Sequence, residues 1–150
     1  MKTEINKKAG DFIVVGVDGS DSSKSALQWA VQLAPLVAGD IRVIIAWEYP
    51  IMFGWEGGMP SWGNLGDNAE SVLKNSLESA FGSDHPKGLV SKVRQGHPAS
   101  VLLEESQDAK MLILGSRGLG GFASLLLGSV SAYCAEHAKC PVLIVHDNKK

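Results

Sequence analysis

Residues 111–131 read MLILGSRGLGGFASLLLGSVS, a short apolar run followed by a segment in which five of the seventeen residues 115–131 are glycine. The run MLIL predicts a buried strand, because it has no polar alternation. Glycines after such a strand let the backbone approach a ligand closely, since they carry no Cβ. The segment therefore predicts a loop that binds an anion with backbone amides, although it lacks the Lys of the usual phosphate-binding loop.

Further apolar runs alternate with helical patterns along the rest of the chain. DFIVVGV at 11–17 and IRVIIAW at 41–47 predict buried strands, LVSKVR at 89–94 predicts an edge strand because of its charges, and PVLIVH at 141–146 predicts a last strand. Helical patterns lie between them, for example from about Asp67 and from Pro98. This alternation predicts an α/β fold, a doubly wound and Rossmann-like five-stranded parallel sheet with helices on both faces.

Composition favours an ordinary globular protein. The 150 residues are 45% hydrophobic and 20% charged, with a formal net charge of −2. We expect a polar N-terminal tail at 1–10 and a single domain at 11–147. The charge gives no reason to expect nucleic acid or a membrane as partner. The polar start and the presence of only Cys134 and Cys140 predict a cytoplasmic protein with free thiols.

Two glycine-containing loops follow predicted strands, one after Gly16 and one after Gly115. In open α/β sheets, ligands bind beyond the carboxyl ends of the strands, where the strand order reverses. If the first and fourth strands are neighbours, the order is 3-2-1-4-5 and both loops border one crevice. The residues 118–123 also satisfy GxGxxA, which leaves a nicotinamide- or flavin-linked protein open as an alternative.

The spacing Gly115-x-x-Gly118, then nine residues, then Gly128-Ser129 resembles the nucleotide motif of the ATP-binding branch of the universal stress protein family. IVVGVDGSDSSKSALQWA at 13–30 resembles the family's first strand and helix, and residues 108–146 resemble its C-terminal half. The resemblance implies ATP, with Mg²⁺, bound between the ends of the first and fourth strands.

Candidate ligand-binding residues come from this resemblance and from the two loops; they are Gly16, Asp18, Trp47, Gly115, Ser116, Arg117, Gly118, Gly128, Ser129, Val130 and Ser131. The residues 128–131 would offer amides and hydroxyls to phosphates at a helix start. Asp18 would lie beside the nucleotide or cap the first helix. Trp47 would edge the adenine pocket or simply be buried in the core.

We expect a nucleotide-responsive regulatory module of the stress response, with no catalytic residues assigned. Hydrolysis needs a group that orients water and cations that offset phosphate charge, and only Asp18 and Arg117 are candidates. A slow ATPase or phosphotransfer enzyme and a non-binding structural dimer remain alternatives. The resemblance also implies a homodimer through the apolar strand Pro141–Val145, and a regulatory protein partner of unknown identity. The aromatic loop at 49–66 is a candidate lid or mobile segment, or a poorly ordered loop whose aromatic side chains pack on the second helix.

Overall fold

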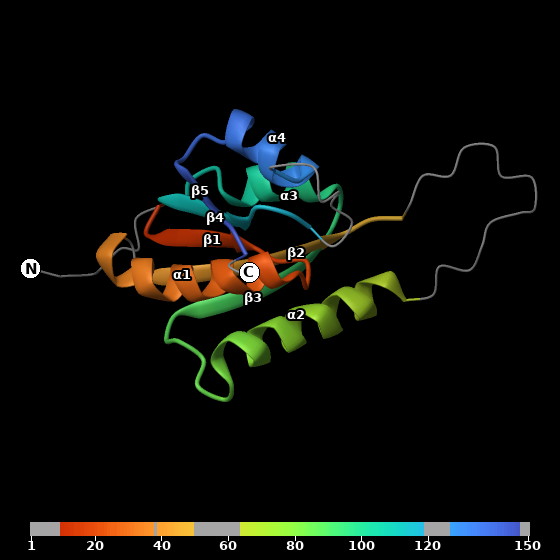
Figure 1. Ribbon diagram of the computed structural model, residues 1–150, viewed down its shortest axis with the longest axis horizontal. Coiled ribbons are helices and arrows are strands. Elements are labelled where there is room, and N and C mark those ends of the chain that lie inside the picture. Colours follow the sequence, from red (N-terminus) through yellow and green to blue (C-terminus); the bar gives the residue numbers. More distant parts are fainter. Residues whose placement is uncertain (1–9, 38, 50–63, 119–126, 148–150) are drawn as a thin grey trace, which may run out of the picture.

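The computed structural model describes residues 10–37, 39–49, 64–118 and 127–147. The elements in chain order are β1 (Phe12–Gly16), α1 (Asp21–Val37), β2 (Asp40–Trp47), α2 (Leu65–Phe81), β3 (Leu89–Gln95), α3 (Pro98–Glu105), β4 (Met111–Gly115), α4 (Ser129–His137) and β5 (Val142–Val145). The strands form one sheet in the order β3-β2-β1-β4-β5, and every neighbouring pair is parallel (Figure 1). This confirms the predicted strand order and the doubly wound fold.

Helices cover both faces of the sheet, with α1 and α2 on one side and α3 and α4 on the other (Figure 1). Successive strand residues point to opposite faces. In β1, Ile13 and Val15 pack toward α1 and α2, whereas Phe12 and Val14 pack toward α3 and α4. All five residues of β1 are buried because it lies at the centre of the sheet, which explains its continuous apolar sequence.

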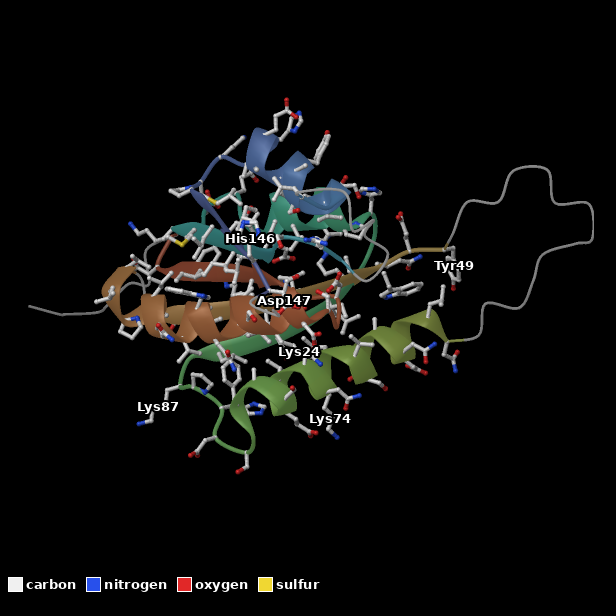
Figure 2. All side chains as sticks on the ribbon, viewed as in Figure 1. Lys24, Tyr49, Lys74, Lys87, His146 and Asp147 are labelled. Atoms are coloured by element: carbon white, nitrogen blue, oxygen red, sulfur yellow. The ribbon has the colours of Figure 1, made fainter. Side chains whose placement is uncertain are left out.

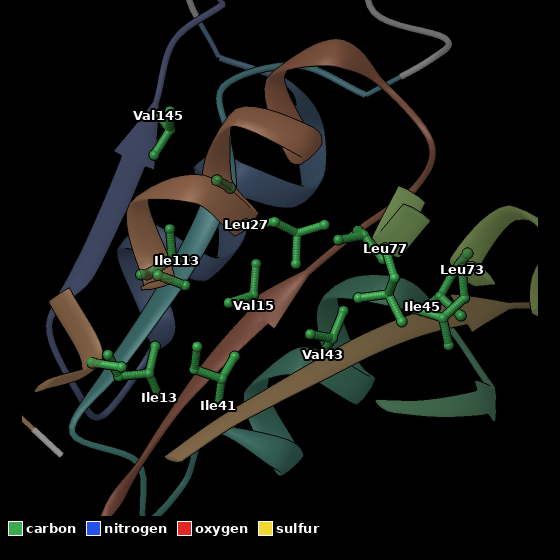
Figure 3. Close-up of a cluster of buried hydrophobic side chains, with 14 of the residues drawn as sticks. Ile13, Val15, Leu27, Ile41, Val43, Ile45, Leu73, Leu77, Ile113 and Val145 are labelled. Carbon is green, nitrogen blue, oxygen red and sulfur yellow. The ribbon is translucent and has the colours of Figure 1, made fainter. Parts of the chain in front are cut away.

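The larger hydrophobic cluster lies between the sheet and the helices α1 and α2 (Figure 3). Leu27 of α1 is fully buried there, among side chains from β1, β2 and β4. The small residues Ala26, Ala30 and Ala34 bring α1 close to the sheet. This close contact places the first turn of α1 directly beside the end of β4, where the candidate site lies.

The edge strand β3 carries its charges on the face that α3 only partly covers. Lys92 and Arg94 both bond to the carboxylate of Glu105, at 3.2 and 2.9 Å, and Arg94 also bonds to Glu104 at 2.9 Å. Burial raises the pKa of Glu105, but the hydrogen bonds from Arg94 and Lys92 outweigh it and hold the pKa below its usual value. These ion pairs tie α3 to the edge of the sheet.

Some sequence predictions fall on residues outside the described part of the chain. Most of the predicted aromatic loop at 49–66 lies there, since residues 50–63 are not described, and so does most of GxGxxA at 118–123. The second helix begins at Leu65, two residues before the predicted start near Asp67.

Candidate functional site

A cavity of about 500 Å³ opens where β1 and β4 end, between the first turns of α1 and α4. It has the size typical of small-molecule sites. Most of the predicted site residues line it, namely Gly16, Asp18, Gly115, Arg117, Gly118, Gly128, Ser129, Val130 and Ser131. Two elements far apart in sequence therefore meet at the predicted crevice. Ser116 and Trp47 are the predicted residues that do not line the cavity.

The described lining also includes residues that were not among the predicted ligand-binding residues. They are Val17, Ser20, Ser23, Ile44, Ala46, Pro98, Leu102 and Leu114. The apolar members come mainly from β2, β4 and α3 and form a wall opposite the polar loops. A wall of this kind suits a flat apolar group, while the loops suit a charged one.

The loop after β4 is tied to the start of α4 through the carbonyl of Ser116. The amide of Gly128 donates to this oxygen at 2.6 Å, and the hydroxyl of Ser131 lies 3.1 Å from it. The Ser131 hydroxyl also lies 3.1 Å from the carbonyl of Gly128. The hydroxyl of Ser131 therefore donates its proton to a backbone carbonyl of the protein. Ser116 itself is buried and lies outside the cavity lining.

The loop after β1 is ordered by its own polar side chains. Ser20 precedes α1, and its hydroxyl accepts the amide of Ser23 at 3.3 Å, so Ser20 caps the helix. Asp18 does not hold that position; its carboxylate accepts the amide of Ser20 at 2.9 Å and closes the turn. The second carboxylate oxygen of Asp18 faces Gly118, where a Cβ would lie 2.7 Å from it.

Two glycines after β4, Gly115 and Gly118, lie where a side chain would meet a neighbouring group at less than 3.0 Å. None of Gly115, Gly118 and Gly128 has a positive φ. A Cβ on Gly115 would collide with the hydroxyl of Ser22 and would lie 2.7 Å from the backbone of α1. Among the described residues, a Cβ on Gly118 would meet only the Asp18 carboxylate. The missing side chain of Gly115 therefore lets α1 pack against the end of β4. The missing side chain of Gly118 leaves room for the Asp18 carboxylate.

The N-terminus of α4 faces the cavity. The first amides of a helix have no partner within it, and the N-cap Gly128 has no side chain that could bond to them. The amides of Ser129 and Val130, both in the cavity lining, are therefore oriented as anion-binding donors. The helix dipole adds to their attraction for negative charge.

Trp47 lies on the face of the sheet that α1 and α2 cover, away from the cavity. Its ring makes an edge-to-face contact with the ring of Tyr49, with 5.3 Å between ring centroids, and packs against Gly66 at the start of α2. Figure 2 shows Tyr49 just beyond the end of β2. The Trp47 carbonyl accepts the amide of Gly96 and so points to the β3 side. The alternation of a parallel ladder turns the backbone of Ala46 the other way, toward β1.

Other chemistry finds little support in the described part of the chain. No group of three or more His, Cys, Asp or Glu side chains there could hold a metal ion. Both thiols are free, and burial raises the pKa of Cys134 to about 11. Burial also raises the pKa of Cys140. These thiols are therefore protonated at neutral pH. No described helix is long and apolar enough to cross a membrane.

Comparison with known proteins identifies the family. The model of the universal stress protein family matches residues 11–146, so the chain belongs to this family. It is 31% identical over 143 residues to a universal stress protein of Mycolicibacterium smegmatis, covering 89% of this chain and 47% of the relative. It is 35% identical over 136 residues to universal stress protein Mb2019 of Mycobacterium bovis, covering 88% and 43%. The chain thus spans about half the length of these curated relatives.

Solved structures share the fold. Universal stress protein UspA from Lactobacillus plantarum superposes with a TM-score of 0.69 at 17% identity, over 89% of this chain and 96% of that one. A universal stress protein in complex with cAMP has a TM-score of 0.64 at 28% identity, over 91% and 97%. The Archaeoglobus fulgidus universal stress protein in complex with dAMP has a TM-score of 0.55 at 19% identity, over 89% and 95%.

Proposed function

We propose that this protein binds ATP at the cavity between β1 and β4 and acts as a nucleotide-responsive regulatory module. One observation carries the proposal: the predicted glycines and the start of α4 converge on a single cavity. The cavity combines an apolar wall with the first amides of α4, which together match a base and a chain of phosphates. The cAMP and dAMP complexes of the two relatives support a nucleotide as the ligand class.

In this arrangement the phosphates bind at the amides of Ser129 and Val130, and the base lies against Leu102 and the other apolar residues. Ala46 lines the cavity, and its backbone N–H and C=O face β1, so in this proposal they contact the base in place of Trp47. Asp18 would hold Mg²⁺, because its carboxylate belongs to the same lining as Ser129 and Val130 and such ions usually take one or two carboxylates plus phosphate oxygens.

The described lining favours binding over rapid chemistry. Asp18 is its only carboxylate and Arg117 its only cation. Fast phosphoryl transfer normally uses several groups that position water and offset charge. We infer that occupancy by ATP alters the surface that the start of α4 and the loop after β4 present to a regulatory protein partner.

Calorimetric titration of ATP with Mg²⁺ tests this function. We expect micromolar binding to the wild-type protein and none of comparable strength with NAD. Gly118→Ala should weaken ATP binding about tenfold or more, because its Cβ displaces the Asp18 carboxylate. Gly66→Ala is the matched control, since its Cβ would press on the Trp47 ring, away from the cavity. It should bind ATP as the wild type does.

Two results would contradict the proposal. One is the absence of binding to wild-type protein from which bound nucleotide has been removed. The other is a Gly118→Ala affinity equal to that of Gly66→Ala, which would place the nucleotide elsewhere.

We further propose a homodimer through the edge of β5, as the strand Pro141–Val145 implies. The described sheet ends at β5, and Val142, Leu143 and Ile144 are only partly buried. The carbonyls of Pro141 and Val145 accept amides from the β4 side. Ladder alternation therefore turns the amides of Val142 and Ile144 outward, where a second β5 can pair with them.

Ile144→Pro should convert the dimer to a monomer, because proline removes an outward amide and leaves the bonds to β4 intact. Ile144→Val keeps that amide and should remain dimeric. Sedimentation equilibrium measures the mass of each variant. A monomeric wild type, or a dimeric Ile144→Pro protein, would show that this edge is not the interface.

A further inference from the structure

Ser22 is a buried residue of α1 whose hydroxyl bonds outside its own helix. It donates to the carbonyl of Arg117 at 2.7 Å, and the residue is only 4% exposed. Ser22 is not among the residues that line the cavity. It therefore contacts the loop after β4 from behind.

This bond fixes the direction of one peptide unit. The peptide between Arg117 and Gly118 is planar and trans, so its carbonyl and its amide point in opposite directions. Because the carbonyl points to Ser22, the amide of Gly118 points away from α1. The nitrogen of Gly118 lies near Gly128, where a Cβ would be 3.4 Å from it. The Ser22 hydroxyl thus orients the amide of Gly118, a backbone donor close to the start of α4.

Two neighbouring carbonyls of this loop are held by two different helices. That of Ser116 is bonded from the α4 side, by the amide of Gly128. That of Arg117 is bonded from the α1 side, by Ser22 and more weakly by Ser20 at 3.3 Å. The space that a Cβ on Gly115 would need is filled by Ser22. A serine fits here because it is small and still supplies a hydroxyl.

We propose that Ser22 is a positioning residue for the phosphate-bearing part of the ligand, an inference that rests on the proposed nucleotide function. Its bond to Arg117 holds the amide of Gly118 in the orientation that receives a phosphate oxygen. Loss of the bond leaves the apolar wall intact, since Leu102, Ile44 and Ala46 belong to other elements. The effect is therefore confined to ligands that carry phosphate.

The test compares ATP with Mg²⁺ and adenosine as ligands of Ser22→Ala, by calorimetry. We expect ATP to bind about tenfold more weakly than to the wild type, in line with the loss of one orienting hydrogen bond. Adenosine should change by less than about twofold on the same scale. Ser106→Ala is the matched control, because Ser106 is equally buried and donates to the Leu103 carbonyl away from the cavity. It should leave both affinities unchanged.

Ser22→Cys provides a second variant of similar size with a weaker donor, and it carries the test if Ser22→Ala does not fold. It should show the same selective loss of ATP affinity. Equal losses for ATP and adenosine, or no loss, would overturn the role of Ser22 alone. A wild-type protein that binds neither ligand would instead refute the proposed function, and the inference with it.

Discussion

Gly115→Ala is expected to lower the free energy of unfolding by about 3 kcal/mol, the upper part of the range for overpacked sites. The added Cβ would lie 2.7 Å from the carbonyl carbon of Ser22 and from the nitrogen of Ser23. Backbone atoms at the start of a helix cannot turn aside as a side chain can. Either α1 or the end of β4 must move, and both carry the site. Thermal unfolding should show a melting temperature lower by about 6–12 °C.

Gly118→Ala is the matched control for this stability change, because it adds the same methyl group three residues later. In the described part of the chain, its Cβ would meet only the end of the Asp18 side chain, which can rotate away. We expect its melting temperature to fall by much less than that of Gly115→Ala. Equal melting temperatures for the two variants would mean that α1 does not press on β4 as described.

Leu27→Ala should lower the free energy of unfolding by about 3 kcal/mol as well, because it opens a cavity in the main core. Leu27 is 0% exposed and lies among side chains from three strands (Figure 3). The surrounding strands are held by the parallel ladder, so they cannot collapse fully into the space left behind. Chemical denaturation, followed by circular dichroism, gives the free energy directly.

Leu36→Ala makes the same substitution in the same helix at a residue that is 78% exposed. It should change the free energy of unfolding by less than about 0.5 kcal/mol. Comparable losses in the two variants would contradict the burial of α1 on the sheet. The comparison also removes the contribution of helix propensity, which is common to both variants.

The fold could be predicted because its strands are apolar throughout and alternate with amphipathic segments. The strand order followed from one further premise, that the two glycine-containing loops border one crevice, and the structure confirms that β1 and β4 are neighbours. The positions of the two polar loops could also be predicted from the sequence. Glycine spacing and turn residues are local features, and they remain visible in sequence.

The apolar wall could not be predicted, because it depends on how α3 packs across β1 and β2. Pro98 and Leu102 follow the third strand, and nothing in their sequence ties them to the end of β1.

Trp47 illustrates a second limit. A strand that is apolar on nearly every position does not reveal which of its two faces borders the cavity, so the pattern did not favour Ala46 over Trp47. In the structure the two side chains lie on opposite faces of β2.

Some serine hydroxyls line the cavity and others hold the loops in place, and the amino-acid sequence does not show which serine does which. Ser129 is exposed at the start of α4, whereas Ser131 is buried two residues later and bonds to Ser116. Ser22 and Ser23 are adjacent, yet only Ser23 lines the cavity. These roles depend on which carbonyls the fold brings within reach.

A crystal structure of the protein with ATP and Mg²⁺ tests the central claim most directly. We predict that the nucleotide lies between the ends of β1 and β4, with its phosphates at the amides of Ser129 and Val130 and its base against Leu102 and Ala46. An empty cavity in crystals grown at saturating ATP, or a nucleotide bound at another surface, would contradict the claim that these glycine loops form the binding site.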